Sequence, residues 1–213
     1  MNATLKLSLA LAAVLAFAAP AWSQETEGGV QEKAQQTLES AKGDVVLVLH
    51  MLGNHGPAYH RRYPKAFARF TPACESDDLR QCSREQIVNA YDNALLYTDH
   101  VLAQTVRWLG ERAARFDAGL VYVSDHGESL GESGLFLHGV PFMIAPSEQT
   151  QVPMVWWMSP GFARSAAVDP ACLAGQAKQA WTHDNLFHTT LGLVGVETSV
   201  YERALDMAGP CRQ

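Results

Sequence analysis

The chain has 213 residues, of which 47% are hydrophobic and 18% are charged, and its formal net charge is −6. This composition is too apolar for a disordered chain, and the length suits one domain or a domain with a short extension. The acidic balance argues against general nucleic-acid binding, which normally needs a basic patch. No run of Lys and Arg is long enough to favour an anionic membrane surface as the main partner.

Residues 1–23 have the pattern of a secretory signal peptide. Lys6 is their only charge, and an uncharged, mostly apolar stretch follows over residues 7–22. This stretch is short for a membrane span, which needs about 20 apolar residues. Ala21 and Ser23 put small residues at the positions that a signal peptidase requires. We therefore expect export and cleavage after Ser23; the alternative is an uncleaved signal that anchors the chain in the membrane.

After a polar linker at residues 24–30, helix-like and strand-like patterns alternate along the chain. This alternation predicts an α/β fold, with a layered, parallel-type sheet flanked by helices. The expected elements are a helix over 31–42, a buried strand over 45–49, a long helix that starts at the Ser83/Gln86 capping-box pattern, a second buried strand over 120–123, a third strand over 152–157, and a last helix over 186–194 with Asp184 as its N-cap.

The four cysteines fit an exported chain better than a zinc site, because no C-x-x-C spacing is present. Four cysteines allow three pairings, and the sequence alone does not choose among them. Proximity favours Cys74–Cys82, because a short loop closes readily. Cys172 and Cys211 then remain as the other candidate pair.

The strongest chemical signal is the segment 124–129, which reads Ser-Asp-His-Gly-Glu-Ser and directly follows the expected strand at 120–123. Ligands of open α/β sheets bind beyond the carboxyl ends of the strands. Asp125 and His126 offer an oxygen and an imidazole nitrogen, which are both zinc ligands. The alternative is a loop in which Asp125 caps a helix and His126 is merely exposed.

Two further loops each present a histidine beside glycine. His55 stands in Gly-Asn-His-Gly-Pro and His138 in His-Gly-Val-Pro. Each loop alone is better explained as an ordinary turn with a surface histidine. Together with Asp125 and His126, the three loops favour a metal or phosphate site over three unrelated turns.

At these residues the sequence resembles the lipid A phosphoethanolamine transferases of the alkaline phosphatase and sulfatase superfamily. The resemblance covers nearly all of residues 31–213, which we expect to form a catalytic domain that is incomplete on its N-terminal side. The matching stretches, in chain order, are 43–50, 54–59, 62–64, 70–74, 89–93, 124–132, 137–141 and 184–187.

The resemblance implies roles for the same side chains. Asp125 and His126 are similar to two ligands of the catalytic zinc. His55 and His138 resemble the pair that holds the transferred phosphate or a second zinc, and Glu128 resembles a supporting carboxylate. Cys74–Cys82 resembles a periplasmic disulfide of the family. The family moves phosphoethanolamine from phosphatidylethanolamine to lipid A at the cell inner membrane, through a phosphothreonine and with zinc.

The chain departs from the family in one respect. The family's membrane domain, nucleophilic threonine and acidic zinc ligand belong to a region that should precede residue 31. None of Thr71, Thr98 and Thr105 takes the nucleophile's place, because each lies in a segment that matches another part of the family. We therefore expect a periplasmic, transferase-like chain that is inactive alone. The alternatives are a non-catalytic module that binds zinc or phosphate, a fragment that completes a partner chain, and a gene remnant.

Overall fold

The computed structural model describes residues 27–212, so the expected signal peptide and the first residues of the expected linker lie outside it. The described chain divides into two compact units. Unit 1 contains residues 27–50, 113–118 and 158–212, and unit 2 contains residues 51–112 and 119–157. None of the described helices is both long enough and apolar enough to cross a membrane.

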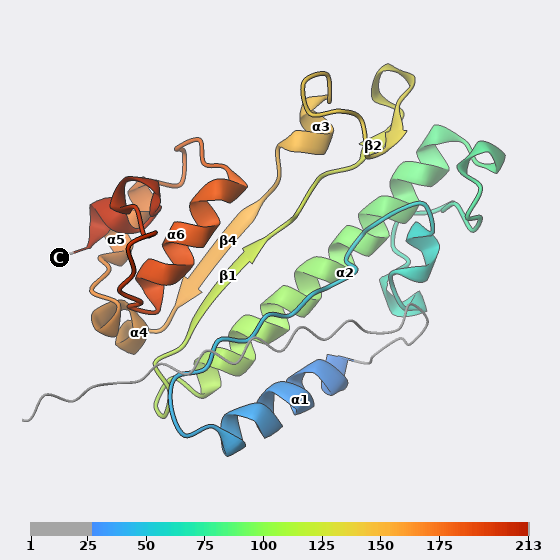
Figure 1. The fold of residues 1–213 in the computed structure, drawn as a ribbon. Coiled ribbons are helices and arrows are strands. Elements are labelled where there is room, and N and C mark those ends of the chain that lie inside the picture. Colours follow the sequence, from blue (N-terminus) through green and yellow to red (C-terminus); the bar gives the residue numbers. More distant parts are fainter. Residues whose placement is uncertain (1–26, 213) are drawn as a thin grey trace, which may run out of the picture. The chain divides into compact units, whose positions relative to one another are not determined.

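Unit 1 consists of helices and loops, and unit 2 combines helices with short strands, which confirms the α/β class (Figure 1). The helices are α1 (Glu27–Ser40), α2 (Arg84–Glu111), α3 (Ser147–Thr150), α4 (Pro160–Ser165), α5 (Pro170–Gly175) and α6 (His183–Leu193). The strands are β1 (Gly119–Val123), β2 (Ser129–Leu130), β3 (Phe136–Leu137) and β4 (Met154–Met158).

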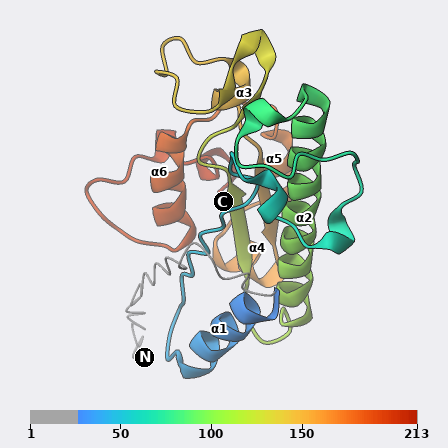
Figure 2. The same cartoon turned by 90° about the vertical axis from the view of Figure 1, so that its right-hand side faces the viewer.

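Helix α2 is the longest element of unit 2 and starts as its sequence predicts. The Ser83 hydroxyl accepts the Gln86 N–H at 3.2 Å, and the Gln86 side chain accepts the Ser83 N–H at 2.8 Å. This reciprocal pair satisfies two backbone donors that a helix start leaves without partners. The helix continues past Gly110 to Glu111, and α2 and β1 lie side by side in both views (Figure 1, Figure 2).

Strands β1 and β4 form a two-stranded sheet, at the positions expected for the second and third strands. The Ser124 N–H donates to the Pro153 carbonyl at one end of the pair, and the Ser159 N–H donates to the Ala118 carbonyl at the other. These two bonds make the pair antiparallel, whereas the apolar runs favoured a parallel sheet. Strands β2 and β3 form a second antiparallel pair, with Ser129 opposite Leu137.

The expected strand over residues 45–49 is wrong, because this segment belongs to no strand of the described chain. Val48 and Leu49 are 47% and 45% exposed. An apolar, β-branched run favours extended backbone, but a strand also needs a neighbour that takes its hydrogen bonds. The first helix differs as well, since α1 begins at Glu27, inside the segment that we expected to be a linker.

Unit 1 contains α4, α5, α6 and the disulfide Cys172–Cys211, which confirms the second candidate pair. The N-cap of α6 is Thr182 rather than Asp184, and the Thr182 N–H donates to the Asn185 side chain at 2.9 Å. The fully buried Asp206 carboxylate of this unit accepts a hydrogen bond at 3.1 Å from the Arg212 guanidinium.

The core of unit 2 holds α2 against the loops that carry the chemistry. Its buried residues are Tyr59, Cys74, Ile87 and Ala90. Cys74 is joined to Cys82 with a Cα–Cα distance of 5.7 Å, which confirms the pairing that proximity favoured.

The fully buried Asn93 on α2 holds the loop backbone at residues 69 and 70. Its side-chain oxygen accepts the N–H groups of Arg69 and Phe70 at 2.7 and 2.8 Å, and its amide donates to the Phe70 carbonyl at 2.9 Å. A single polar side chain therefore replaces the partners that a strand would have given to this loop.

We expect Asn93→Ala to lower the free energy of unfolding by about 2–4 kcal/mol, because it leaves the backbone groups of a packed loop without partners. Urea denaturation measures the change. Asn89→Ala is the matched control on the same helix: its amide makes one exposed bond, to the Pro72 carbonyl at 2.9 Å, and its loss should change the stability by less than about 1 kcal/mol. Equal losses in the two variants would contradict the assignment.

Candidate metal centre

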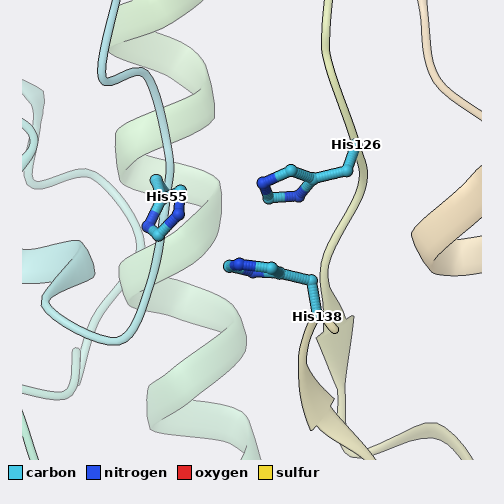
Figure 3. A group of neighbouring side chains, drawn as sticks. All are labelled: His55, His126 and His138. Atoms are coloured by element: carbon cyan, nitrogen blue, oxygen red, sulfur yellow. The ribbon is translucent and has the colours of Figure 1, made fainter. Parts of the chain in front are cut away.

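Three histidines from distant parts of the sequence meet in unit 2. His55 lies in the loop before the short 3-10 helix Tyr59–Arg61, His126 follows β1, and His138 follows β3. One ring nitrogen from each histidine lies within 4.8 Å of the other two, and the three side chains point toward one another (Figure 3). The ring centroids of His126 and His138 are 3.9 Å apart, and those of His55 and His138 are 4.7 Å apart.

Glycines beside two of these histidines allow the loops to approach this closely. A Cβ atom at Gly56 would lie 2.5 Å from the Leu137 side chain and 2.7 Å from the Tyr59 hydroxyl. A Cβ atom at Gly127 would collide with the backbone carbonyl of Glu148. The glycines therefore allow tight packing around the histidines.

The Nδ1 atom of each imidazole faces an acceptor. His55 Nδ1 lies 2.6 Å from the Gly56 carbonyl, and His126 Nδ1 lies 3.0 Å from the Gly127 carbonyl. His138 Nδ1 lies 3.0 Å from the Glu128 carboxylate. Because carbonyls and carboxylates only accept, each of these contacts is a hydrogen bond only when the proton is on Nδ1, and in that neutral tautomer Nε2 keeps its lone pair. Metal-binding histidines typically have this outer partner.

Glu128 connects two of the three loops through a buried carboxylate that is only 4% exposed. Its Oε1 accepts the Gly56 N–H at 3.0 Å and faces His138 Nδ1, and its Oε2 accepts the Tyr59 hydroxyl at 2.8 Å. A carboxylate buried without partners would cost several kcal/mol, so these donors are what allows it to stay in place. Glu128 thus holds His138 and the backbone next to His55 at the same time.

Tyr59 is the residue of this network that sequence reasoning did not single out. Burial, together with the neighbouring Glu128 carboxylate, raises the pKa of its hydroxyl far above the ordinary value. The phenol therefore stays protonated and donates to Glu128 throughout the physiological pH range. Its place four residues after His55, inside a stretch that resembles the family, was the available signal.

Asp125 lies beside the histidine group and not within it. Its side chain is 82% exposed, its Oδ1 accepts the His126 N–H at 3.1 Å, and its Oδ2 lies 3.9 Å from His126 Nε2. The structure thus brings His55, His126 and His138 together, places Glu128 behind them and leaves Asp125 on the solvent side of His126. Three imidazole lone pairs, one of them with a carboxylate nearby, form a donor set suited to zinc.

Two of the three threonines at positions 71, 98 and 105 have their hydroxyls engaged elsewhere. Thr98 donates to the Ala94 carbonyl at 3.1 Å, and Thr105 donates to the Val101 carbonyl at 2.9 Å. Both bonds lie within α2, where such back-bonding is common.

Comparison with known proteins places this geometry in a family. Residues 29–196 match the family model described as Sulfatase. Phosphoethanolamine transferase EptA of Escherichia coli K12 is 47% identical over 180 residues, which are 84% of this chain and 33% of that protein. Phosphatidylethanolamine transferase Mcr-1 of Escherichia coli is 44% identical over 153 residues, which are 72% of this chain and 27% of that protein.

A solved structure shows the same fold. The soluble domain of lipooligosaccharide phosphoethanolamine transferase A from Neisseria meningitidis superposes with a TM-score of 0.83 at 39% identity, over 88% of this chain and 56% of that domain. The match to the family model covers most of the chain, so the protein belongs to the sulfatase family. Within it, the relatives compared are phosphoethanolamine transferases, and the chain spans about a third of the length of the curated relatives it matches.

We expect Tyr59→Phe to weaken zinc binding by the group of His55, His126 and His138 by about tenfold, because Glu128 loses the donor that fixes its second oxygen and holds His138 less firmly. Competition titration with a chromogenic chelator measures the affinity. Tyr91→Phe is the control, since its partly buried ring lies 5.5 Å from that of the buried Tyr59, and its hydroxyl is hydrogen-bonded to Asn54 and not to Glu128. Unchanged affinity in Tyr59→Phe would contradict the role assigned to its hydroxyl.

Proposed function

We propose that this chain forms the zinc- and phosphate-handling part of a phosphoethanolamine transferase, whose donor is phosphatidylethanolamine and whose acceptor is lipid A. The observation that carries the proposal is the convergence of three imidazole groups whose Nδ1 atoms all face acceptors. The identities of 47% and 44% to two named transferases support the reaction class.

His126 and Asp125 bind the catalytic zinc in this proposal. The carboxylate of Asp125 already lies 3.9 Å from His126 Nε2, so a small rotation brings both donors to one ion. Zinc supplies Lewis acidity that stabilises charge on the phosphoryl oxygens and on the attacking oxygen. The structural relative EcEptC of Escherichia coli, whose structure is a complex with Zn, shares the fold at 23% identity and a TM-score of 0.73.

His55 and His138 hold the phosphoryl oxygens of the headgroup, or a second zinc. Their Nδ1 atoms are already engaged in hydrogen bonds with the Gly56 carbonyl and with Glu128. The Nε2 side of each ring is therefore the side available to a ligand. A protonated ring donates its Nε2–H to a phosphoryl oxygen, whereas a neutral ring coordinates a metal. Glu128 orients both groups and does not need to contact the substrate.

The family's threonine nucleophile and its acidic zinc ligand have no counterpart that we can assign in residues 31–213. We propose that both come from a segment or a partner chain outside this sequence. We also propose that the chain is exported to the periplasm, as its N-terminal pattern indicates, and that it acts at the inner membrane where the donor lipid resides.

We expect the purified chain to contain zinc, with a ratio near one per chain, and Asp125→Ala/His126→Ala to lose it, because the double variant removes two donors. Elemental analysis of protein purified from the periplasm gives the ratio. His100→Ala is the control: His100 lies on α2 and packs against Phe67, with ring centroids 4.9 Å apart. Equal background zinc in parent and double variant would overturn the metal site.

We expect the isolated chain to give no transfer from a fluorescent phosphatidylethanolamine to lipid A, because no covalent phosphothreonine forms without the nucleophile. Thin-layer chromatography of the labelled lipids follows the reaction. Turnover that is lost in Asp125→Ala would contradict this expectation and would mean that the chain is catalytically complete. A chain that carries the missing residues can then be added. Zinc binding with still no turnover would favour a non-catalytic binding module.

A further inference from the structure

Three consecutive large apolar side chains stand almost fully in solvent in the loop between β3 and α3. Phe142 is 83% exposed, Met143 is 95% exposed and Ile144 is 73% exposed. The other exposed large hydrophobic residues among those described range from 42% to 56%. We call residues 142–144 the apolar tip. In both Figure 1 and Figure 2, the loop that leads into α3 projects past the ends of β1 and β4.

The base of this loop is fixed, so the exposure of the tip is built into the fold. The Ile144 N–H donates to the Pro141 carbonyl at 2.9 Å, which closes the turn. Below it, the buried Gln149 side chain accepts the Val140 N–H at 3.4 Å and donates to the Ser129 hydroxyl at 2.9 Å. A closed turn on a clamped base keeps the three side chains outside instead of letting them fold back.

The base also adjoins the histidine group. The Gln149 carbonyl accepts the Gly127 N–H at 3.0 Å, and Gly127 and Ser129 are the neighbours of Glu128. On the other side of the loop, His138 precedes Phe142 by four residues, a span of at most about 14 Å. The backbone of the tip is thus held within about 14 Å of the backbone at His138, a distance of the same order as the polar region and the upper acyl chains of one leaflet.

We propose that the apolar tip inserts into the lipid bilayer beside the donor lipid and sets the height of the histidine group at the headgroup level; this inference rests on the proposed function. Between Glu132 and Glu148 the chain has no Asp, Glu, Lys or Arg, so insertion buries no charge. Interfacial apolar groups reach about 5–10 Å into the boundary between headgroups and acyl chains, which suits a tip of one turn.

A protein surface fits the tip less well than a bilayer does. Three side chains of this size offer roughly 400 Å², about half of the ~800 Å² that each partner buries in a stable protein–protein interface. The tip is also convex, so a protein partner would need a matching groove, whereas fluid lipid adapts to any convex shape. A second copy of this chain is therefore disfavoured as the occupant.

The test places an environment-sensitive fluorophore on the tip of the purified full chain. All four native cysteines are in disulfides, so Met143→Cys provides the single free thiol. The vesicles are phosphatidylethanolamine with phosphatidylglycerol at about 3:1, or phosphatidylcholine alone, each with and without a quencher on the acyl chains. Ala103→Cys, exposed on α2, is the matched control position.

We expect a blue shift and acyl-chain quenching at position 143 with both lipids, and neither effect at position 103. Phe142→Ser/Met143→Ser/Ile144→Ser should bind vesicles about 100-fold more weakly, at about fivefold for each partly inserted side chain, with unchanged zinc content. Lack of quenching at 143 in both lipids would overturn the proposal. So would a probe response that follows protein concentration without vesicles, since sedimentation would then show a dimer.

Zinc removal separates this inference from the proposed function. Insertion that persists after chelation, and in Asp125→Ala/His126→Ala, supports a tip that acts through its own apolar surface. Insertion in a parent chain that binds no zinc would keep the tip and refute the transferase site. Zinc at about one per chain with no insertion would refute the tip and keep the site. Insertion that disappears whenever zinc is removed would overturn the tip as an independent anchor.

Discussion

The buried carboxylate of Glu128 is the group on which the arrangement of the candidate site depends. Its side chain is only 4% exposed, and the donors of Gly56, Tyr59 and His138 offset the cost of burying it. Those donors come from two loops that are about eighty residues apart in sequence, so satisfying one buried carboxylate also fixes the distance between the loops. The hydrogen bonds that hold the carboxylate thereby also position the imidazole rings of His55 and His138. Metal and phosphate sites need outer support of this kind.

The loop that carries His55 has little regular structure of its own, so its rigidity comes from α2. The capping box at Ser83 defines where α2 begins, and the disulfide Cys74–Cys82 ties down the chain just before it. Asn93, two turns into the helix, supplies the hydrogen bonds that a sheet would otherwise have given to this chain. Tyr59 then joins the two levels, because its ring lies in the core beside Ile87 while its hydroxyl reaches Glu128. The packing of the core and the positioning of the Glu128 carboxylate therefore depend on the same side chain in this unit.

The sequence predicted features that depend on neighbours in the chain, such as the start of α2 at Ser83 and the strand before Ser124. Both disulfides also agreed with expectation. The prediction failed at residues 45–49, because an apolar run cannot tell whether a partner strand lies beside it. The pattern at His55, His126 and His138 predicted that they would meet, but not that the exposed Asp125 would lie outside their group. Tyr59 escaped notice because its function arises from burial next to a distant carboxylate, and burial is a property of the fold.

An enzyme whose substrate is a phospholipid must provide two environments. The phosphate needs charged, directional hydrogen-bond partners, whereas the acyl chains need apolar surroundings. Under the proposed function, the two requirements meet at Gln149 in this chain. Its carbonyl accepts the Gly127 N–H between His126 and Glu128, and its amide oxygen accepts the Val140 N–H at the foot of the apolar tip. Gln149 is 5% exposed, and its side chain also donates to the Ser129 hydroxyl. It therefore couples the backbone at Gly127 to the base of the apolar tip. An apolar contact alone is non-directional and fixes no geometry. Because Gln149 links the two parts, the depth to which the apolar tip inserts into the bilayer sets the height of the imidazole rings above it.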